Sequence, residues 1–257
     1  MHQIGLKLWS TNDFYVEEAQ KLFSKKVYNY IELYTVPDSY AKFYRIWRNL
    51  NIPYIIHAPH FTHGVNLASK INFKKNIELI EEAQRFADTL KAKYIIVHPG
   101  CNGDIKETAR QLGQIDDSRI LVENMPYLGI EDGIICNGST YNELQYVLSH
   151  TNKGFCLDIH HAFSSSAYHK IDPISFVKKL LTLRPSMFHL ADSKTTYVRD
   201  KHLNIGKGNL PIKDIIKLIP NNSFISLETK KQTIQNLNVF IEDVSIIKEL
   251  ENYDQNK

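Results

Sequence analysis

The chain has 257 residues, of which 43% are hydrophobic and 23% are charged, and this balance is typical of a folded globular protein rather than a disordered one. Its 31 Lys and Arg residues against 28 Asp and Glu residues leave a net charge of +3, so no global electrostatic field favours nucleic acid or a membrane as partner. No apolar run reaches the roughly 18 residues of a membrane span, and the amino terminus lacks a secretory signal pattern.

Short β-branched or aromatic runs alternate with longer stretches of helical spacing along the chain. The predicted strands, in chain order, are Ile4–Leu8, Tyr30–Leu33, Tyr54–His57, Tyr94–His98, Ile120–Glu123, Gly154–Asp158, Met187–His189 and Phe224–Glu228. The predicted helices follow them in turn, near Val16–Lys25, Asp38–Leu50, Asn72–Leu90, Asp104–Leu112, Tyr141–Ser149, Pro173–Leu183, Pro211–Leu218 and Gln235–Leu250. We expect the polar segment Glu251–Lys257 to fray.

This repeated strand–helix pattern has no composition break or linker, and it predicts parallel strands joined by helical crossovers. At this length the pattern favours a closed (β/α)8 TIM barrel, an α/β fold in which residues 1–257 form one domain. An open doubly wound sheet is the alternative, but no glycine-rich dinucleotide fingerprint follows the first strand to support it.

The three cysteines, Cys101, Cys136 and Cys156, form no CxxC pair, and their odd number is typical of a reducing compartment. Cys156 lies inside an apolar run and is expected in the core. We therefore expect a cytoplasmic protein with no membrane partner, and we expect it to be a monomer.

Seven of the eight predicted strands have an acidic residue or a histidine at or next to their carboxyl end, whereas composition would place about one there. These residues are Glu32, His57, His98, Glu123, Asp158, His189 and Glu228. The carboxyl ends of barrel strands meet at one rim. Carboxylates and imidazoles crowded there would be costly to bury unless cations lay among them. Mixed ligands of this kind favour zinc, manganese or iron over magnesium or calcium.

Two segments beyond the strands add candidate ligands. A further imidazole follows Asp158 by about one turn, at His160 or His161. Asp200 and His202 are two residues apart, so their side chains face the same way in an extended segment. Such a pair alone is more typical of a solvated loop, but beside the rim residues it suggests another metal site. Because one tetrahedral zinc ion needs only four ligands, the whole set predicts a multinuclear centre.

Several short segments resemble, in order, those of the endonuclease IV family (AP endonuclease family 2), a member of the xylose-isomerase-like TIM barrel superfamily. They are His57–Pro59, His98–Gly100, Val122–Asn124, Cys156–Phe163, His189–Lys194, Asp200–His202 and Leu227–Thr229. The resemblance extends over about residues 50 to 230. It implies a zinc-dependent hydrolase that acts in DNA repair and cleaves the DNA backbone 5′ to abasic sites.

The resemblance also implies three zinc ions, with manganese as an alternative metal. The match by position assigns His57 and His98 to one ion and Asp158, His189 and Glu228 to a second, and Glu123 would bridge these two ions. His161, Asp200 and His202 would hold the third ion. His161 is preferred to His160 because it lies three residues from Asp158 and precedes Ala162 and Phe163. Zinc lowers the pKa of its water to about 7, so no separate base is required. Glu123 is the candidate catalytic residue that accepts the proton of the nucleophile.

The segments expected to bind DNA match the family less well. The loop at residues 34–38 has no Lys or Arg, although the family has a polar, basic loop there. His60 and Phe61 stand where the family has a bulky pair that enters the base stack, and Phe61 either fills that role or packs on the barrel. Basic residues gather later in the chain. Among them Lys194 and Lys207 are candidate phosphate ligands, although a solvated surface explains them equally well.

Glu32 is similar to a glutamate of sugar isomerases and epimerases of the same superfamily. These enzymes hold one divalent ion, with ligands that would map to Glu123, Asp158, His189 and Glu228, and use carboxylates as acid and base. His57, His98 and the Asp200–His202 pair have no role in that reaction but are required by the nuclease. A barrel that binds metal or DNA ends without turnover is the non-enzymatic alternative, which the sequence disfavours because no ligand is missing.

Overall fold

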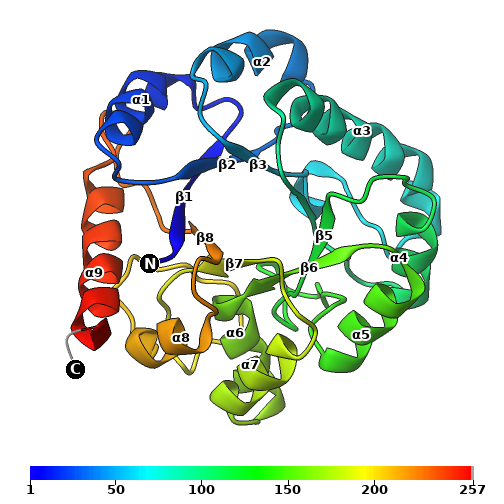
Figure 1. The fold of residues 1–257 in the computed structure, drawn as a ribbon. Helices are drawn as coiled ribbons and strands as arrows, with labels where there is room; N and C mark the ends of the chain where they lie inside the picture. Colours follow the sequence, from blue (N-terminus) through cyan, green and yellow to red (C-terminus); the bar gives the residue numbers. More distant parts are fainter. Residues whose placement is uncertain (256–257) are drawn as a thin grey trace.

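Eight parallel strands form a closed barrel in the order β1 to β8, and helices surround it (Figure 1). The computed structural model describes residues 1–255. The strands are β1 (Gln3–Trp9), β2 (Tyr30–Tyr34), β3 (Tyr54–His57), β4 (Ile95–Val97), β5 (Ile120–Glu123), β6 (Gly154–Asp158), β7 (Met187–Leu190) and β8 (Phe224–Leu227). The pairing of β8 with β1 closes the ring. The predicted (β/α)8 barrel is confirmed, although His98 and Glu228 each lie one residue beyond their strands.

The helices cover the outer face of the barrel. They are α1 (Val16–Ser24), α2 (Tyr40–Asn49), α3 (Phe73–Leu90), α4 (Ile105–Leu112), α5 (Tyr141–His150), α6 (Ile159–His169), α7 (Pro173–Leu181), α8 (Ile212–Leu218) and α9 (Asn238–Gln255), with short 3-10 turns η1 (Asp13–Tyr15), η2 (Phe61–His63) and η3 (Lys70–Asn72). Among the described residues, no helix combines the length and the apolar character needed to cross a bilayer.

The predicted frayed tail begins inside a helix instead. Helix α9 continues to Gln255, and Glu251 accepts a hydrogen bond from the backbone N–H of His2 at 2.9 Å. This contact joins the first residue of the predicted tail to the other end of the chain. The last two residues, Asn256 and Lys257, lie outside the described part of the chain.

Helix α6 has no counterpart among the predicted helices. It starts directly after Asp158, whose side chain caps it by accepting a hydrogen bond from the backbone N–H of His161 at 2.6 Å. Residues 159–166 are all buried, so the helix shows no polar face. Its sequence therefore lacks the alternation of apolar and polar residues by which surface helices are recognised.

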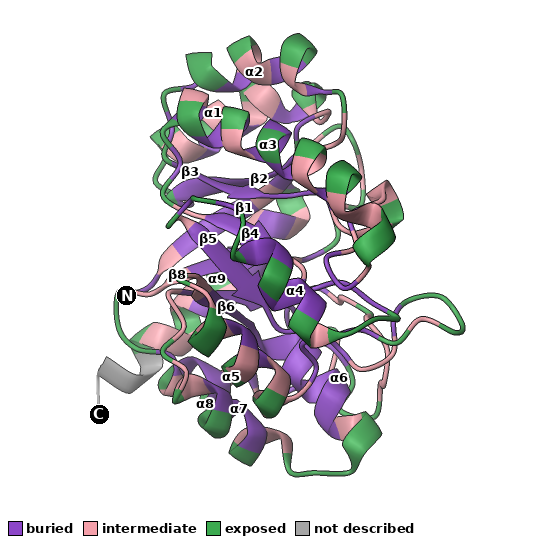
Figure 2. Ribbon diagram, turned by 90° about the vertical axis from the view of Figure 1, so that its right-hand side faces the viewer, coloured by how far each residue is buried: buried purple, intermediate pink, exposed green. Residues whose placement is uncertain are grey.

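The strands are mostly buried (Figure 2), and their side chains belong to two separate cores. Outward side chains such as Ile31, Ile56 and Val122 pack beneath the helices. A smaller core inside the barrel consists of Tyr30, Ile55, Ile96, Leu121, Cys156 and Met187, which includes the cysteine predicted to be buried. Since side chains two residues apart on a strand share a face, the next lumen positions are Glu32, His57, His98, Glu123, Asp158 and His189. Strand alternation thus places the polar residues above an apolar floor.

Candidate metal centre

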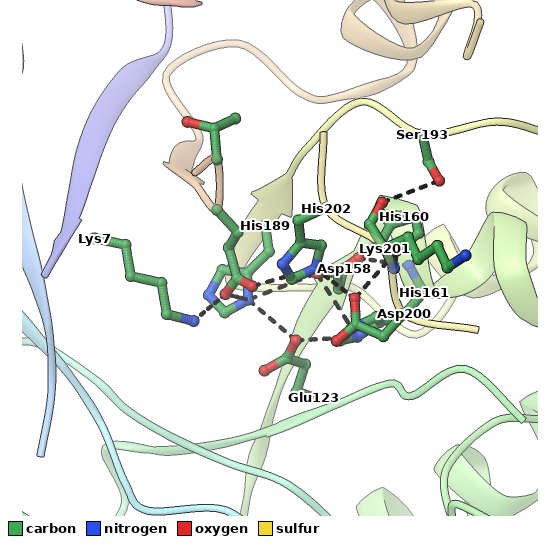
Figure 3. Close-up of polar contacts among 12 residues, drawn as sticks. Lys7, Glu123, Asp158, His160, His161, His189, Ser193, Asp200, Lys201 and His202 are labelled. Carbon is green, nitrogen blue, oxygen red and sulfur yellow. Dashed lines mark hydrogen bonds and ion pairs between the residues drawn. The ribbon is translucent and has the colours of Figure 1, made fainter. Parts of the chain in front are cut away.

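The nine predicted ligands come together at the carboxyl end of the barrel. Figure 3 labels Glu123, Asp158, His161, His189, Asp200 and His202 among them. The candidate ligand atoms form groups in which all atoms lie within 4.8 Å of one another. The groups are His57–His98–Glu123, Glu123–Asp158–His189–Glu228, Asp158–His161–His202, His160–Asp200–His202 and Glu32–His57–Glu228. Two residues outside the predicted set, Glu32 and His160, also take part.

Glu123 joins two of these groups at the end of β5, where its side chain is buried. Its Oε2 lies 3.3 Å from Nε2 of His57 and 3.1 Å from Nε2 of His98. Its Oε1 lies 3.1 Å from Nδ1 of His189 and 3.2 Å from Nδ1 of His161. Because each oxygen faces a different pair of imidazoles, the carboxylate is placed to bridge two cations.

His189 is held by carboxylates on both sides of its ring. Its Nε2 donates to Oε2 of Glu32 at 2.9 Å, and its Nδ1 lies 2.7 Å from Oε1 of Glu228. Lys7 of β1 forms ion pairs with both glutamates, at 3.1 Å to Oε1 of Glu32 and more closely to Glu228. Because Glu32 accepts the Nε2 hydrogen, Nδ1 is the ring nitrogen directed at the other candidate ligands.

The third group joins the start of α6 to the loop after β7. Nε2 of His161 lies 3.6 Å from Oδ2 of Asp200, and Nε2 of His202 lies 3.0 Å from Oδ1 of Asp200. Nδ1 of His161 donates to the backbone carbonyl of Asn124 at 2.9 Å. That bond leaves the lone pair on Nε2, where a metal ion can use it.

His160 lies closer to Asp200 than His161 does, and its ligand atom forms a group with those of Asp200 and His202. Its Nε2 is 3.2 Å from Oδ1 of Asp200, but the same nitrogen accepts a hydrogen bond from the backbone N–H of Lys201 at 2.9 Å. The bond uses the lone pair that a metal ligand must offer. Of the two neighbouring histidines, His161 is therefore the better candidate ligand.

Four buried atoms of the nine predicted ligands make no hydrogen bond within the described part of the chain. They are Oδ2 of Asp158, Nε2 of His161, Oδ1 of Asp200 and Nε2 of His202, and the last two form an ion pair with each other at 3.0 Å. A buried polar atom without a partner costs about 1–3 kcal/mol. Their concentration in one place indicates that another group completes them. The mixture of imidazole nitrogens and carboxylate oxygens fits a divalent transition metal.

Burial and mutual charge set the protonation of the cluster. Burial lowers the pKa of His60 to about 2, helped by the neighbouring rings of His98 and His57. Burial also disfavours the charged form of His161, but the carboxylates of Asp158 and Asp200 raise its pKa well above the usual value. Cations bound here would displace protons from such imidazoles, since only a free nitrogen lone pair can bind a metal.

A cavity of about 1000 Å³ opens over these groups. His60, one of the predicted substrate-binding residues, lines it, and its ring stacks on that of His98 with centroids 5.3 Å apart. Phe61, Lys194 and Lys207 are not among the described residues that line the cavity. Lys194 and Lys207 are exposed, and the Nζ of Lys194 lies 5.8 Å from the ring centroid of Tyr197. That these three residues contact DNA on the surface outside the cavity remains a prediction.

Lys7 is the site residue that the sequence reasoning missed. The ligands were predicted from acidic residues and histidines at the ends of strands, and a lysine is neither. A different signal was available, because Lys7 is the one charged residue within the strand Gln3–Trp9. A charge at a lumen position of an apolar strand requires a buried partner.

A family model described as "Xylose isomerase-like TIM barrel" matches residues 22–250. The chain is 27% identical over 211 residues to "Probable endonuclease 4" of Mycoplasmopsis synoviae, covering 75% of this chain and 73% of that protein. It is 29% identical over 196 residues to "Probable endonuclease 4" of Carboxydothermus hydrogenoformans, covering 67% of this chain and 66% of that protein.

Two solved structures illustrate the range of similar folds. A D-tagatose 3-epimerase-like protein is 21% identical, with a TM-score of 0.76 and coverage of 99% of this chain and 98% of that one. Endonuclease IV from Thermus thermophilus is also 21% identical, with a TM-score of 0.67 and coverage of 95% and 99%. At such identity the likeness shows the fold alone, and the fold is common to both classes of enzyme.

Proposed function

The chain belongs to the xylose isomerase-like TIM barrel family, and from this premise we propose that it is a metal-dependent hydrolase that cleaves the DNA backbone 5′ to abasic sites. The observation that supports this most is the position of Glu123, whose two oxygens face different imidazole pairs. A single-ion enzyme needs no such bridge. The relatives named endonuclease 4 favour the same activity.

We assign three zinc ions to the cluster, in the arrangement that the resemblance implies. His57 and His98 would hold the first, and Asp158, His189 and Glu228 the second, with Glu123 between them. His161 and His202, which lie 3.6 Å and 3.0 Å from the carboxylate oxygens of Asp200, would hold the third together with Asp200. When bound, such ions supply Lewis acidity at the phosphate and a water of lowered pKa.

The chain's own residues orient these ligands and handle the proton. Glu32 fixes the ring of His189 through Nε2, and the backbone carbonyl of Asn124 fixes the ring of His161 through Nδ1. Glu123 is the carboxylate nearest to both imidazole pairs, so it is placed to accept the proton of the attacking water. The buried apolar layer below Glu123 fills the lumen, so bulk water can reach the site only from the side of the cavity.

A sugar isomerase or epimerase is the second candidate. The group Glu123–Asp158–His189–Glu228 could by itself hold one ion, which favours this reading. Against it, Glu32, the glutamate shared with those enzymes, is engaged by Lys7 and His189. The positive charge of Lys7 and the hydrogen bond from His189 stabilise the ionised form of Glu32, so this carboxylate is a weak base for the removal of a substrate proton.

Metal analysis and a nicking assay on duplex DNA with one abasic analogue test the proposal together. We expect about three metal ions per chain and strand cleavage on the 5′ side of the analogue. Asp158→Ala removes a ligand atom shared by two groups and should abolish cleavage. Asp116→Asn, an exposed carboxylate, should not change it. One ion per chain, no cleavage, and turnover of a ketose would overturn the nuclease and support the isomerase.

A further inference from the structure

The mouth of the cavity exposes large apolar side chains. Trp9 is 46% exposed, Phe14 49%, Ile130 61% and Ile234 69%, and all four line the same cavity. Exposed apolar residues that occur singly need no explanation, but a group of them around a hollow indicates a binding surface. This group surrounds the entrance to the predicted metal centre.

Trp9 begins a row of rings that leads into the cavity. It lies two residues after Lys7 on β1, so its side chain shares the lumen face of that strand. In the barrel register Trp9 pairs with Tyr34, and Tyr34 pairs with His57. The ring centroids lie 5.3 Å apart at both steps. The row connects the open edge of the cavity with a candidate metal ligand.

Lysines from the loops at the carboxyl end of the barrel line the same cavity as these rings. They are Lys201, Lys230 and Lys231, in the loops after β7 and β8. Lys201 and Lys230 are exposed, and the Nζ of Lys201 lies 4.8 Å from the ring centroid of Tyr197. Positive charge beside flat aromatic faces is the combination by which proteins bind single-stranded nucleic acid.

We propose that Trp9 and Phe14 stack on the bases of an unpaired or single-stranded stretch of DNA while Lys201 and Lys230 bind its phosphates. This inference rests on the proposed function, because it names the form of DNA that the same site receives. A nucleic-acid strand has both a flat face for the rings and a charge for the lysines. The loop at residues 34–38 contains neither Lys nor Arg, so the loops after β1, β7 and β8 supply the contacts that it lacks.

Tryptophan fluorescence of the full chain tests the stacking directly. The chain has two tryptophans, and Trp47 is buried with its indole N–H bonded to the backbone carbonyl of Ser10 at 2.8 Å. A short thymidine oligonucleotide should therefore quench the emission of Trp9, and Trp9→Phe should remove the quenching. Quenching that persists in Trp9→Phe would overturn the assignment.

Affinity for the same labelled oligonucleotide, measured by anisotropy, tests each ring. Loss of one stacked ring should weaken binding about tenfold, so we expect this from Trp9→Ala and from Phe14→Ala. Tyr168→Ala is the matched control, because Tyr168 is 40% exposed and is not among the described cavity-lining residues. Unchanged affinity in both ring variants would overturn the proposal.

A comparison of the oligonucleotide with inorganic polyphosphate of equal charge distinguishes base stacking from charge attraction. It uses the parent chain and needs no variant. It should bind the parent chain at least about tenfold more weakly than the oligonucleotide. Equal binding of both probes would mean that the lysines alone attract the polyanion, and would overturn the stacking.

The nicking assay distinguishes failure of this inference from failure of the proposed function. Base-dependent binding without cleavage of abasic DNA would refute the nuclease and leave the aromatic surface intact. Cleavage with unchanged affinity in Trp9→Ala and Phe14→Ala would refute the aromatic surface and leave the nuclease intact.

Discussion

Two layers of side chains fill the barrel lumen, and they differ completely although the same strands supply both. The lower layer is apolar and consists of Tyr30, Ile55, Ile96, Leu121, Cys156 and Met187. The upper layer, two residues later on each strand, consists of Glu32, His57, His98, Glu123, Asp158 and His189. The lower layer is stable by burial of apolar surface alone. The upper layer is stable only where each charge has a partner.

The residues that stabilise the barrel and those that provide its chemistry therefore lie in different layers along the barrel axis. In the upper layer Lys7 supplies positive charge to Glu32 and Glu228, and atoms of the third group have no hydrogen-bond partner in the described chain. The lower layer needs no cation. Substitutions in the two layers should therefore affect different measured quantities.

Glu123→Gln should cause the largest loss. It keeps the shape of the side chain but removes the charge that joins two ligand groups. Bound ions contribute several kcal/mol to transition-state stabilisation, so cleavage of abasic duplex should fall more than about a hundredfold. Metal content per chain should fall as well. Parent-level cleavage by this variant would contradict the role of Glu123.

Leu121→Ala changes the lower layer two residues before Glu123. Truncation of a buried leucine costs about 2–5 kcal/mol of unfolding free energy, which urea denaturation measures. The metal content of the folded variant should stay at the parent value. Ile71→Ala, at a residue that is 96% exposed, should change stability by less than about 0.5 kcal/mol. Metal loss as large as in Glu123→Gln would show that the layers are not separate.

Removal of metal by a chelator should destabilise the upper layer. A ligand present at a hundred times its dissociation constant stabilises the folded state by about 2.7 kcal/mol, so the melting temperature of the chelated chain should fall. The fall in melting temperature should be smaller in Glu123→Gln, because this variant binds fewer metal ions that the chelator can remove. An identical melting temperature with and without chelator would contradict a metal role in this layer.

Glu32→Gln should have a smaller effect, which we expect to see in metal affinity. Glu32 accepts the Nε2 hydrogen of His189 and so orients Nδ1. Loss of such an orienting partner typically costs about 10–100-fold in metal affinity, which titration against a competing chelator measures. Tyr30→Phe is the lower-layer control, because it removes only the hydroxyl that contacts Ser226 at 3.0 Å. Equal affinity of Glu32→Gln and parent would assign Glu32 no orienting role.

Local patterns were sufficient to predict the strands and the residues at their ends. Period-two alternation fixes which side chains share a face, so Glu123 and Asp158 could be placed at the rim before any contact was known. Helix α6 could not be found in this way, because residues 159–166 are buried on all sides and leave no amphipathic pattern.

The barrel and the residue types at its carboxyl end can be predicted from local sequence, because both follow from patterns within a few residues. The contacts between distant residues depend on the closed barrel. Closure of the ring brings Lys7 against Glu228 across 221 positions of sequence, and it engages Nε2 of His160 with a backbone N–H while leaving that of His161 free of a hydrogen bond. Such contacts depend on where distant segments arrive in space, and no local periodicity encodes that.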